Sequence, residues 1–208
     1  MKRKLNLDSW ERQEHFNLFK NYDEPFHSVC IRLECQAAYK LAKEKGISFY
    51  LYYLYQSLKA AQVIEAFKYR ILNEEVFIFE QVDAGSTIPR NNGTFGFGDF
   101  KYFPTLEEFA DQARKVIENV KRTTQLERSA AENVIRYSAL PWIDFTSLSH
   151  ARLFGFRDSC PKISFGKMSE TNGVRSMPVS IHVHHALVDG YHLGQYIECY
   201  QDLMNNTT

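Results

Sequence analysis

The chain has 208 residues, and its 25 Lys and Arg residues are balanced by 25 Asp and Glu residues, so its formal net charge is zero. This balance argues against a nucleic-acid or anionic-membrane partner, because either usually requires a basic face or tail. Hydrophobic residues make up 44% of the chain and aromatic residues 14%. A chain of this length and composition buries about 70% of its unfolded surface, so we predict one globular domain over residues 1–208.

The sequence contains no recognisable targeting segment. The basic residues 1–4 are followed by an alternating polar and apolar stretch rather than by the apolar core of a signal peptide. The longest apolar run, residues 49–55, is far shorter than the ~20 residues that span a membrane. Four cysteines (Cys30, Cys35, Cys160 and Cys199) form no C-x-x-C pair and are interpreted as reduced, buried thiols. These features predict a cytoplasmic protein.

The first half of the chain predicts helices and a hairpin. Asp8 or Ser9 can cap a first helix that begins at Trp10, and alternation predicts a strand over residues 26–33. Helical patterns cover residues 36–45 and 49–62, with Gly46 between them. Residues 67–72 and 76–82 flank a turn and predict a hairpin.

The second half opens with the clearest helix, residues 105–122, which Thr105 can cap. Strands are predicted near residues 134–139, 143–148, 160–168 and 176–184, and the turn residues 171–173 predict a hairpin before the last of them. A helix over residues 190–204 follows. The strands are too unevenly placed for a doubly wound parallel sheet, so the pattern favours an α+β fold.

The densest group of titratable residues is the segment 180–192. Alternation places His182 and His184 on one face of the predicted strand and His185 at the end of the apolar face. Partial burial there would favour the neutral imidazole that a general base requires. The alternatives are a core histidine bonded to backbone, and a zinc site, which is disfavoured because the histidines diverge and no Cys or carboxylate lies at ligand spacing.

Asp189, just before Gly190, has two interpretations. It can be the N-cap of the last helix, which the sequence alone favours. It can also pair with an arginine and so hold the loop that orients His185. The candidate partners are Arg12, Arg32, Arg70 and Arg136.

Residues 184–190 (His-His-Ala-Leu-Val-Asp-Gly) match the H-H-x-x-x-D-G signature of the coenzyme-A-dependent acyltransferase superfamily. Residues 10–16 (Trp-Glu-Arg-Gln-Glu-His-Phe), 138–142 (Ser-Ala-Leu-Pro-Trp) and 145–147 (Phe-Thr-Ser) resemble the trimeric chloramphenicol acetyltransferases, as do residues 82–83 and 166–167. These motifs follow one another in the family's order, so the resemblance covers essentially the whole chain.

The resemblance implies a two-layer α+β sandwich, in which helices cover a large mixed β-sheet. It also implies a homotrimer with active sites between subunits, and direct transfer of acetyl from acetyl-CoA to a hydroxyl of chloramphenicol or a similar small molecule. From the charge balance and the histidine spacing above, we expect no metal, and neither nucleic acid nor a membrane as a partner.

The same resemblance assigns roles to individual residues. His185 is similar to the family's general base, and Ser138 to the serine that hydrogen-bonds the tetrahedral oxyanion. Arg12 and Asp189 match the family's structural ion pair. Ser164 takes the place of a threonine that holds a water near the serine. The coenzyme is expected to contact Lys167, and Met168 replaces a tyrosine that does so.

The acceptor pocket departs from the family pattern more than the catalytic residues do. Leu148 and His150 replace an aromatic residue and a leucine, and Asp158 begins a pair that replaces two aromatic residues. Phe19 takes a tyrosine's place, whereas Thr87 and Phe95 are kept; together these six residues form the expected acceptor pocket. Phe95 belongs to the glycine-rich residues 93–98, which lack the ending of a phosphate-binding loop and predict a flexible or bulged segment that lines a pocket.

Two alternatives to this activity remain open. The catalytic domain of the 2-oxo-acid dehydrogenase acyltransferases shares the signature but uses a lipoyl carrier or another acceptor. A non-catalytic homologue could retain the scaffold and bind a small molecule.

Overall fold

The computed structural model describes residues 1–153 and 158–206 and confirms the α+β class. Its helices are α1 (Gln13–Phe19), α2 (Gln36–Glu44), α3 (Phe49–Val63), α4 (Leu106–Arg122) and α5 (Gly190–Asn205), with short 3-10 turns at Leu7–Ser9 and Glu65–Lys68. Its strands are β1 (Lys2–Lys4), β2 (Phe26–Glu34), β3 (Tyr69–Leu72), β4 (Glu75–Phe79), β5 (Asp83–Pro89), β6 (Phe95–Phe100), β7 (Val134–Ala139), β8 (Lys162–Phe165), β9 (Ser169–Thr171) and β10 (Val174–His184).

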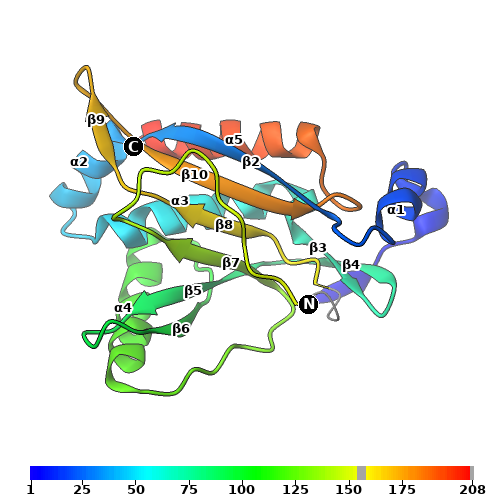
Figure 1. Ribbon diagram of the computed structural model, residues 1–208, viewed down its shortest axis with the longest axis horizontal. Helices are drawn as coiled ribbons and strands as arrows, with labels where there is room; N and C mark the ends of the chain where they lie inside the picture. Colours follow the sequence, from blue (N-terminus) through cyan, green and yellow to red (C-terminus); the bar gives the residue numbers. More distant parts are fainter. Residues whose placement is uncertain (154–157, 207–208) are drawn as a thin grey trace.

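The main sheet has seven strands in the order β2-β10-β8-β7-β5-β6, with β9 paired to β10 (Figure 1). It is mixed, because β7 runs parallel to both of its neighbours and the other pairs are antiparallel. A smaller antiparallel sheet, β1-β4-β3, stands at one end of the molecule. The large mixed sheet with helices on it is the architecture that the sequence predicts.

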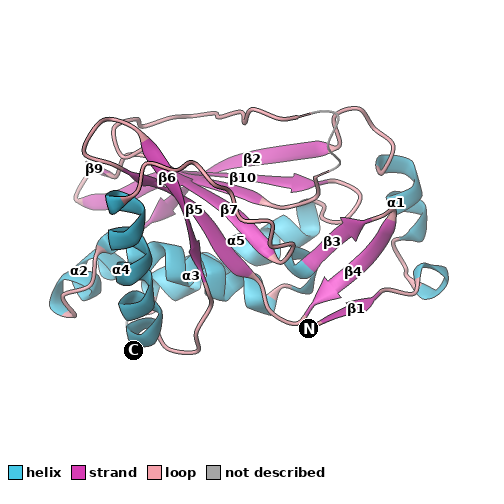
Figure 2. Ribbon diagram, turned by 90° about the horizontal axis from the view of Figure 1, so that it is seen from below, coloured by secondary structure: helices cyan, strands magenta, loops and turns pink. Residues whose placement is uncertain are grey.

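One face of the main sheet is apolar and packs on the helices. Tyr137, Ile163 and Ile181 are buried and lie opposite one another on β7, β8 and β10. Ser57 of α3 donates a hydrogen bond to the Tyr137 hydroxyl (3.2 Å) and shares a second, of 2.5 Å, with the hydroxyl of Tyr196 on α5. These buried bonds join the strands to two helices, and Figure 2 shows the helices gathered on this side.

The opposite face carries polar side chains at the alternate positions of the same strands. Arg136 and Ser138 of β7 share it with Lys162 and Ser164 of β8, because side chains in a strand alternate between faces. Residues 140–153 cross in front of β8 and β10 in Figure 1, and in Figure 2 they run along the side away from the helices. We call residues 140–153 the cover segment. The side chains that it covers on this face of the sheet are polar, and we call them the polar layer.

Local signals account for most helix boundaries. Thr105 caps α4 by accepting a hydrogen bond from the Glu108 backbone N–H, and Asp189 caps α5 by accepting from those of Tyr191 and His192. The β3–β4 hairpin turns through Asn73 and Glu74, both at positive φ, and the β9–β10 hairpin turns through Asn172 and Gly173. The predictions for these elements are confirmed.

Some predicted elements were wrong. The first helix begins at Gln13 rather than Trp10, because Asn6 caps a separate 3-10 turn and the backbone at Trp10 is extended. Residues 143–148 form no strand: they belong to the cover segment, and both neighbours of β8 and β10 are already supplied by other strands. Cys30 is exposed, although it was expected to be buried; all four cysteines are free.

Strands β1, β5 and β6 were not predicted. Residues 95–100, interpreted from the sequence as a flexible or bulged segment, form the regular edge strand β6. Their alternating glycines leave space for neighbours: a Cβ at Gly96 would lie 2.6 Å from both the Val120 Cγ1 and the Arg90 Nη2. Close packing of α4 on this strand therefore requires the glycine that weakens the strand signal in the sequence.

Candidate active site

His185 lies directly after the end of β10 and is held there by backbone and ring contacts. Its backbone N–H donates to the Pro25 carbonyl at 2.8 Å. Its ring stacks on Phe19 of α1, with centroids 3.9 Å apart and planes 9° apart, and it lies 4.2 Å from the His27 ring. Contacts on both sides fix the orientation of the imidazole before a substrate binds.

The two nitrogens of His185 lie in different surroundings. Nδ1 is buried and has no hydrogen-bond partner among the described residues, whereas the residue as a whole is only half-buried. Nε2 is therefore the nitrogen available to a substrate. Burial lowers the pKa of His27 from its ordinary value and outweighs the hydrogen bond to the Val188 carbonyl, which raises it.

Of the four candidate arginines, Arg12 is the partner of Asp189. Arg12 Nη1 forms an ion pair with Asp189 Oδ2, and Arg12 Nη2 donates to the His185 carbonyl at 3.5 Å. Asp189 also contacts His192 Nδ1 at 2.7 Å and caps α5. Burial would raise the pKa of Asp189, but Arg12 and His192 outweigh it and hold the pKa below 3.8. The loop from His185 to Asp189 is thus fixed at both ends, and both interpretations of Asp189 apply.

Ser138 faces Ser164 across the parallel pair β7–β8. Their hydroxyl oxygens are 2.6 Å apart, and Ser164 Oγ lies 3.4 Å from His150 Nε2 of the cover segment. Ser138 is half-buried whereas Ser164 is fully buried. A hydroxyl held by a buried partner can donate a fixed hydrogen bond to a group that binds beside it.

Beside this serine pair, the polar layer holds three histidines and an ion pair. The His182 ring lies 4.5 Å from that of His150, and burial lowers the pKa of both His182 and His184 to about 4. Lys162 is 7% exposed and bonds Asp158 at 2.5 Å. Burial alone would raise the pKa of Asp158, but Lys162 lowers it more. The layer therefore combines neutral imidazoles with one paired charge.

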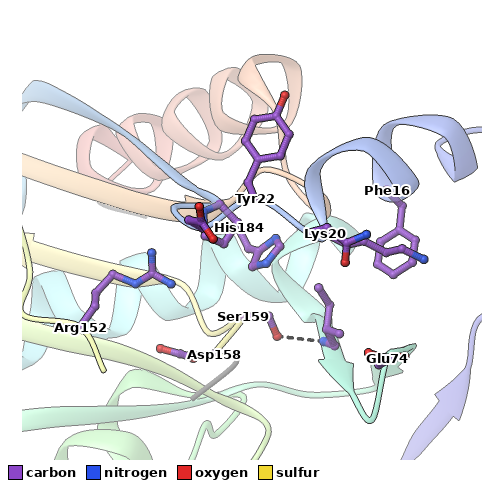
Figure 3. A pocket seen from close by; sticks show the side chains of 12 residues that line it. Phe16, Lys20, Tyr22, Glu74, Arg152, Asp158, Ser159 and His184 are labelled. Carbon is purple, nitrogen blue, oxygen red and sulfur yellow. Dashed lines mark hydrogen bonds between the residues drawn. The ribbon is translucent and has the colours of Figure 1, made fainter. Parts of the chain in front are cut away.

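A cavity of about 590 Å³, the α1 cavity, opens beside His184 (Figure 3). Phe16 and Lys20 lie on one side of it and Arg152 and Asp158 on the other. It is lined by Phe16, Lys20, Asn21, Tyr22, Asp23, Pro25, Ile71, Glu74, Arg152, Asp158, Ser159 and His184. This cavity is large enough for a small-molecule substrate. His185, whose ring packs on Phe19 of α1, is not among its lining residues.

The remaining predicted residues are spread over the molecule. Lys167 is exposed just after β8, and Met168 packs against the core. Leu148 belongs to the cover segment with His150, whereas Thr87 lies on β5. Phe95, on the edge strand β6, is 46% exposed. The structure does not bring these residues together with His185 in one chain.

Sequence reasoning missed His27 and underrated Lys162. His27 faces Val183 across β2–β10, next to the predicted base, and strand pairing is the signal that could have found it. Lys162 was part of a predicted strand, and its alternation with Ser164 already indicated a shared face. Among residues 1–153 and 158–206, no helix is long and apolar enough to cross a membrane, and no group of three or more His, Cys, Asp or Glu residues could hold a metal ion.

Comparisons with known proteins identify the family of this chain. The chloramphenicol acetyltransferase family model matches residues 2–201. The chloramphenicol acetyltransferase of Bacillus pumilus is 30% identical, over 92% of this chain and 88% of its own length. Chloramphenicol acetyltransferase 2 of Escherichia coli is 27% identical, over 98% of this chain and 97% of its own length. A solved chloramphenicol acetyltransferase structure superposes with a TM-score of 0.91 at 30% identity, covering 98% of this chain and all of that one.

A more distant structure shares the fold alone: a dihydrolipoamide acetyltransferase of Azotobacter vinelandii superposes with a TM-score of 0.63 at 13% identity, over 88% of this chain and 82% of that one. The family match over nearly the full length, together with the closely superposing structure, leads to one conclusion. This chain is an acyltransferase and belongs to the chloramphenicol acetyltransferase family.

Proposed function

We propose that the protein transfers acetyl from acetyl-CoA directly to a hydroxyl of a small-molecule acceptor, with His185 as general base and Ser138 as oxyanion stabiliser. The observation that carries this proposal is that the His185 ring and the Ser138 hydroxyl are both held in place by neighbouring side chains. His185 presents Nε2 from a ring fixed on both sides, and Ser138 is held by a buried partner.

The chemistry requires these two functions. An alcohol has a pKa far above neutral, so its oxygen attacks the thioester carbonyl only as a base removes the proton, which accelerates the reaction by ~10²–10⁴-fold. The carbonyl oxygen becomes negative in the tetrahedral intermediate, and one preorganised donor is worth ~10²–10³-fold. The thiolate of coenzyme A then leaves and takes the proton that His185 holds. The intermediate forms without an acyl-enzyme.

Two copies of the chain are needed to complete one site. Ser138 lies opposite Ser164, and Ser164 opposite Ser180 on β10, whereas His185 comes just after β10, five residues beyond Ser180. At about 3.3 Å per residue this separates the two groups by roughly 16 Å along the strands alone. The resemblance to the family implies a homotrimer, and we propose that His185 of one subunit meets Ser138 of the next. Exposed apolar side chains on the cover segment, Trp142 and Ile143, support a further contact surface there.

Several finer parts of the proposal rest on the family. The relatives are named for chloramphenicol, and we propose chloramphenicol or a similar hydroxylated molecule as acceptor. Lys167, exposed at the end of β8, is proposed to meet the phosphate end of the coenzyme, with Met168 beside it. The four free thiols agree with a cytoplasmic location.

Thiol release from acetyl-CoA with chloramphenicol as acceptor tests the reaction. His185→Ala and Ser138→Ala should each lower kcat by ~10²-fold or more with the KM for acetyl-CoA nearly unchanged. His15→Ala is the matched control, because His15 is exposed on α1. Full activity of His185→Ala would show that the base is misassigned, and a monomer in sedimentation would refute the shared site.

A further inference from the structure

Ser164 links the proposed oxyanion donor Ser138 to a histidine of the cover segment. The Oγ atoms of Ser138 and Ser164 are 2.6 Å apart, and His150 Nε2 lies 3.4 Å from Ser164 Oγ. The three side chains come from β7, β8 and the cover segment, so only the tertiary structure brings them together. We call these three residues the serine relay. It ends at the proposed oxyanion site.

The serine relay has a direction, because each hydroxyl has only one proton to donate. Ser138 stabilises an oxyanion only if its proton points toward the substrate, so its own oxygen must accept from Ser164. Ser164 then has no proton left, and its oxygen must accept from His150 Nε2. In the opposite direction Ser164 would donate to His150 and Ser138 to Ser164, which leaves no proton for the oxyanion.

The Ser164 hydroxyl depends on these two partners. Ser164 is fully buried, and within residues 1–153 and 158–206 its hydroxyl bonds only Ser138 and His150. A hydroxyl can rotate and donate to either side, so the serine pair alone does not choose a direction. The choice therefore rests on the ring of His150.

His150 is suited to make this choice. Its ring is half-buried, and burial together with the positive charge of Lys162 lowers its pKa, so the imidazole is neutral near pH 7. A neutral imidazole carries one proton, on Nδ1 or on Nε2. With the proton on Nε2, His150 is a donor toward Ser164, and rotation of a hydroxyl cannot reverse it.

The polar layer holds the His150 ring in place. The His182 ring of β10 lies 4.5 Å from it, with the two planes 77° apart. His182 also bonds the backbone carbonyl of Leu148, two residues before His150, and its Nε2 lies 2.9 Å from Ser180 Oγ. His182 therefore fixes both the cover segment and the ring that this segment carries.

On the basis of the acetyl transfer proposed above, we propose that His150 is a positioning residue for the oxyanion site. With its proton on Nε2 it donates to Ser164, which donates to Ser138 and so directs the Ser138 proton toward the developing oxyanion. Hydrogen bonds in series strengthen one another in a buried setting, so Ser138 also becomes a better donor. His150 acts through Ser164 and does not itself touch the reacting atoms.

Two substitutions separate the hydrogen bond of His150 from the bulk of its ring. His150→Leu retains apolar bulk without a donor, whereas His150→Gln retains an N–H that can reach Ser164. With chloramphenicol and acetyl-CoA, we expect His150→Leu to lower kcat about tenfold, the effect of one hydrogen bond, and to leave the KM for acetyl-CoA unchanged. His150→Gln should stay within about threefold of the wild type. His15→Leu is the matched control, because His15 is exposed on α1. Equal losses in the Leu and Gln variants would overturn the inference.

A residue that acts through Ser164 loses its effect when the Ser164 hydroxyl is removed. In a Ser164→Ala background, His150→Leu should therefore change kcat by less than about twofold. The same tenfold loss in both backgrounds would show that His150 acts independently of the serine pair, by binding the acceptor or by supporting the fold, and would overturn the inference.

Nitrogen-15 NMR of the full chain labelled at histidine tests the direction of the relay without any turnover. It shows which ring nitrogen of each histidine carries the proton, and the signals that disappear in His150→Gln belong to His150. We expect the proton of His150 on Nε2 at pH 7, with a changed Nε2 shift in Ser164→Ala. A proton on Nδ1 alone would overturn the inference even in an active enzyme. A proton on Nε2 without any thiol release would support the direction of the relay and refute acetyl transfer.

Discussion

Asp189 has two structural roles that two substitutions can separate. Asp189→Asn removes the charge that pairs with Arg12 but keeps an oxygen that can cap α5, whereas Asp189→Ala removes both. The side chains of Arg12 and Asp189 are 14% and 28% exposed. The pair therefore lies between a surface ion pair, worth about 0–1 kcal/mol, and a buried one, whose disruption costs about 3–5 kcal/mol.

From this burial we expect Asp189→Asn to lower the free energy of unfolding by about 2 kcal/mol. Asp189→Ala should lower it by about 3 kcal/mol, because loss of an N-cap costs about 1 kcal/mol more. Arg12 also donates to the His185 carbonyl, so loosening the loop should lower kcat by roughly ten- to a hundredfold, in line with the cost of small displacements at a reacting centre.

Urea denaturation of both variants, of Arg12→Met and of the double variant Arg12→Met/Asp189→Asn measures these energies, and the double-mutant cycle isolates the ion pair. Asp144→Asn is the control, since its partner Arg32 lies in an exposed ion pair and a much smaller change is expected. A coupling energy below about 0.5 kcal/mol would show that the pair does not stabilise the loop. Equal stability of the Asn and Ala variants would show that the cap contributes nothing.

Two further predictions concern stability. Burial lowers the pKa of His182 and of His184 from 6.5 to about 4. As the pH falls, the unfolded chain therefore binds protons before the folded chain does. The free energy of unfolding should fall between pH 6.5 and pH 4, by about 2 kcal/mol per histidine at pH 5. Urea denaturation at pH 7 and pH 5 checks this, and an equal loss in His182→Gln would count against His182 as a source. Gly166→Ala should lower the free energy of unfolding by about 2 kcal/mol or more, because its Cβ would lie 2.5 Å from Pro178 Cγ and 2.8 Å from the Ile143 carbonyl oxygen. Gly194→Ala on α5 is the control: its Cβ would have nothing within 4 Å, so stability should be unchanged or raised. Equal melting temperatures of the two variants would refute the steric argument.

The partner of Asp189 illustrates how far the sequence alone reaches. Helix capping depends on residues three positions apart, so Asp189 could be identified as an N-cap without a structure. The choice among four arginines depended on the fold. Arg32 pairs with Asp144, Arg70 donates to backbone carbonyls, and Arg12 reaches Asp189 because α1 packs beside the end of β10.

The glycine-rich residues 93–98 illustrate a limit of a different kind. Strand propensity depends on packing against neighbours more than on the residue itself. Gly96 and Gly98 supply no side chain to that packing, and Val120 and Val116 of α4 fill the space they leave. The strand therefore becomes evident only when the helix that covers it is in place.

The sequence by itself determined the α+β class, most helices with their caps, and both hairpin turns, because these depend on periodicity and on contacts within a few residues. Only the tertiary structure decided that Lys162 and His182 are buried, since the cover segment arrives there from elsewhere in the chain. It also decided that Ser138 and His185 lie at different positions along the sheet. Strand register between distant segments sets that separation, and no local pattern encodes it.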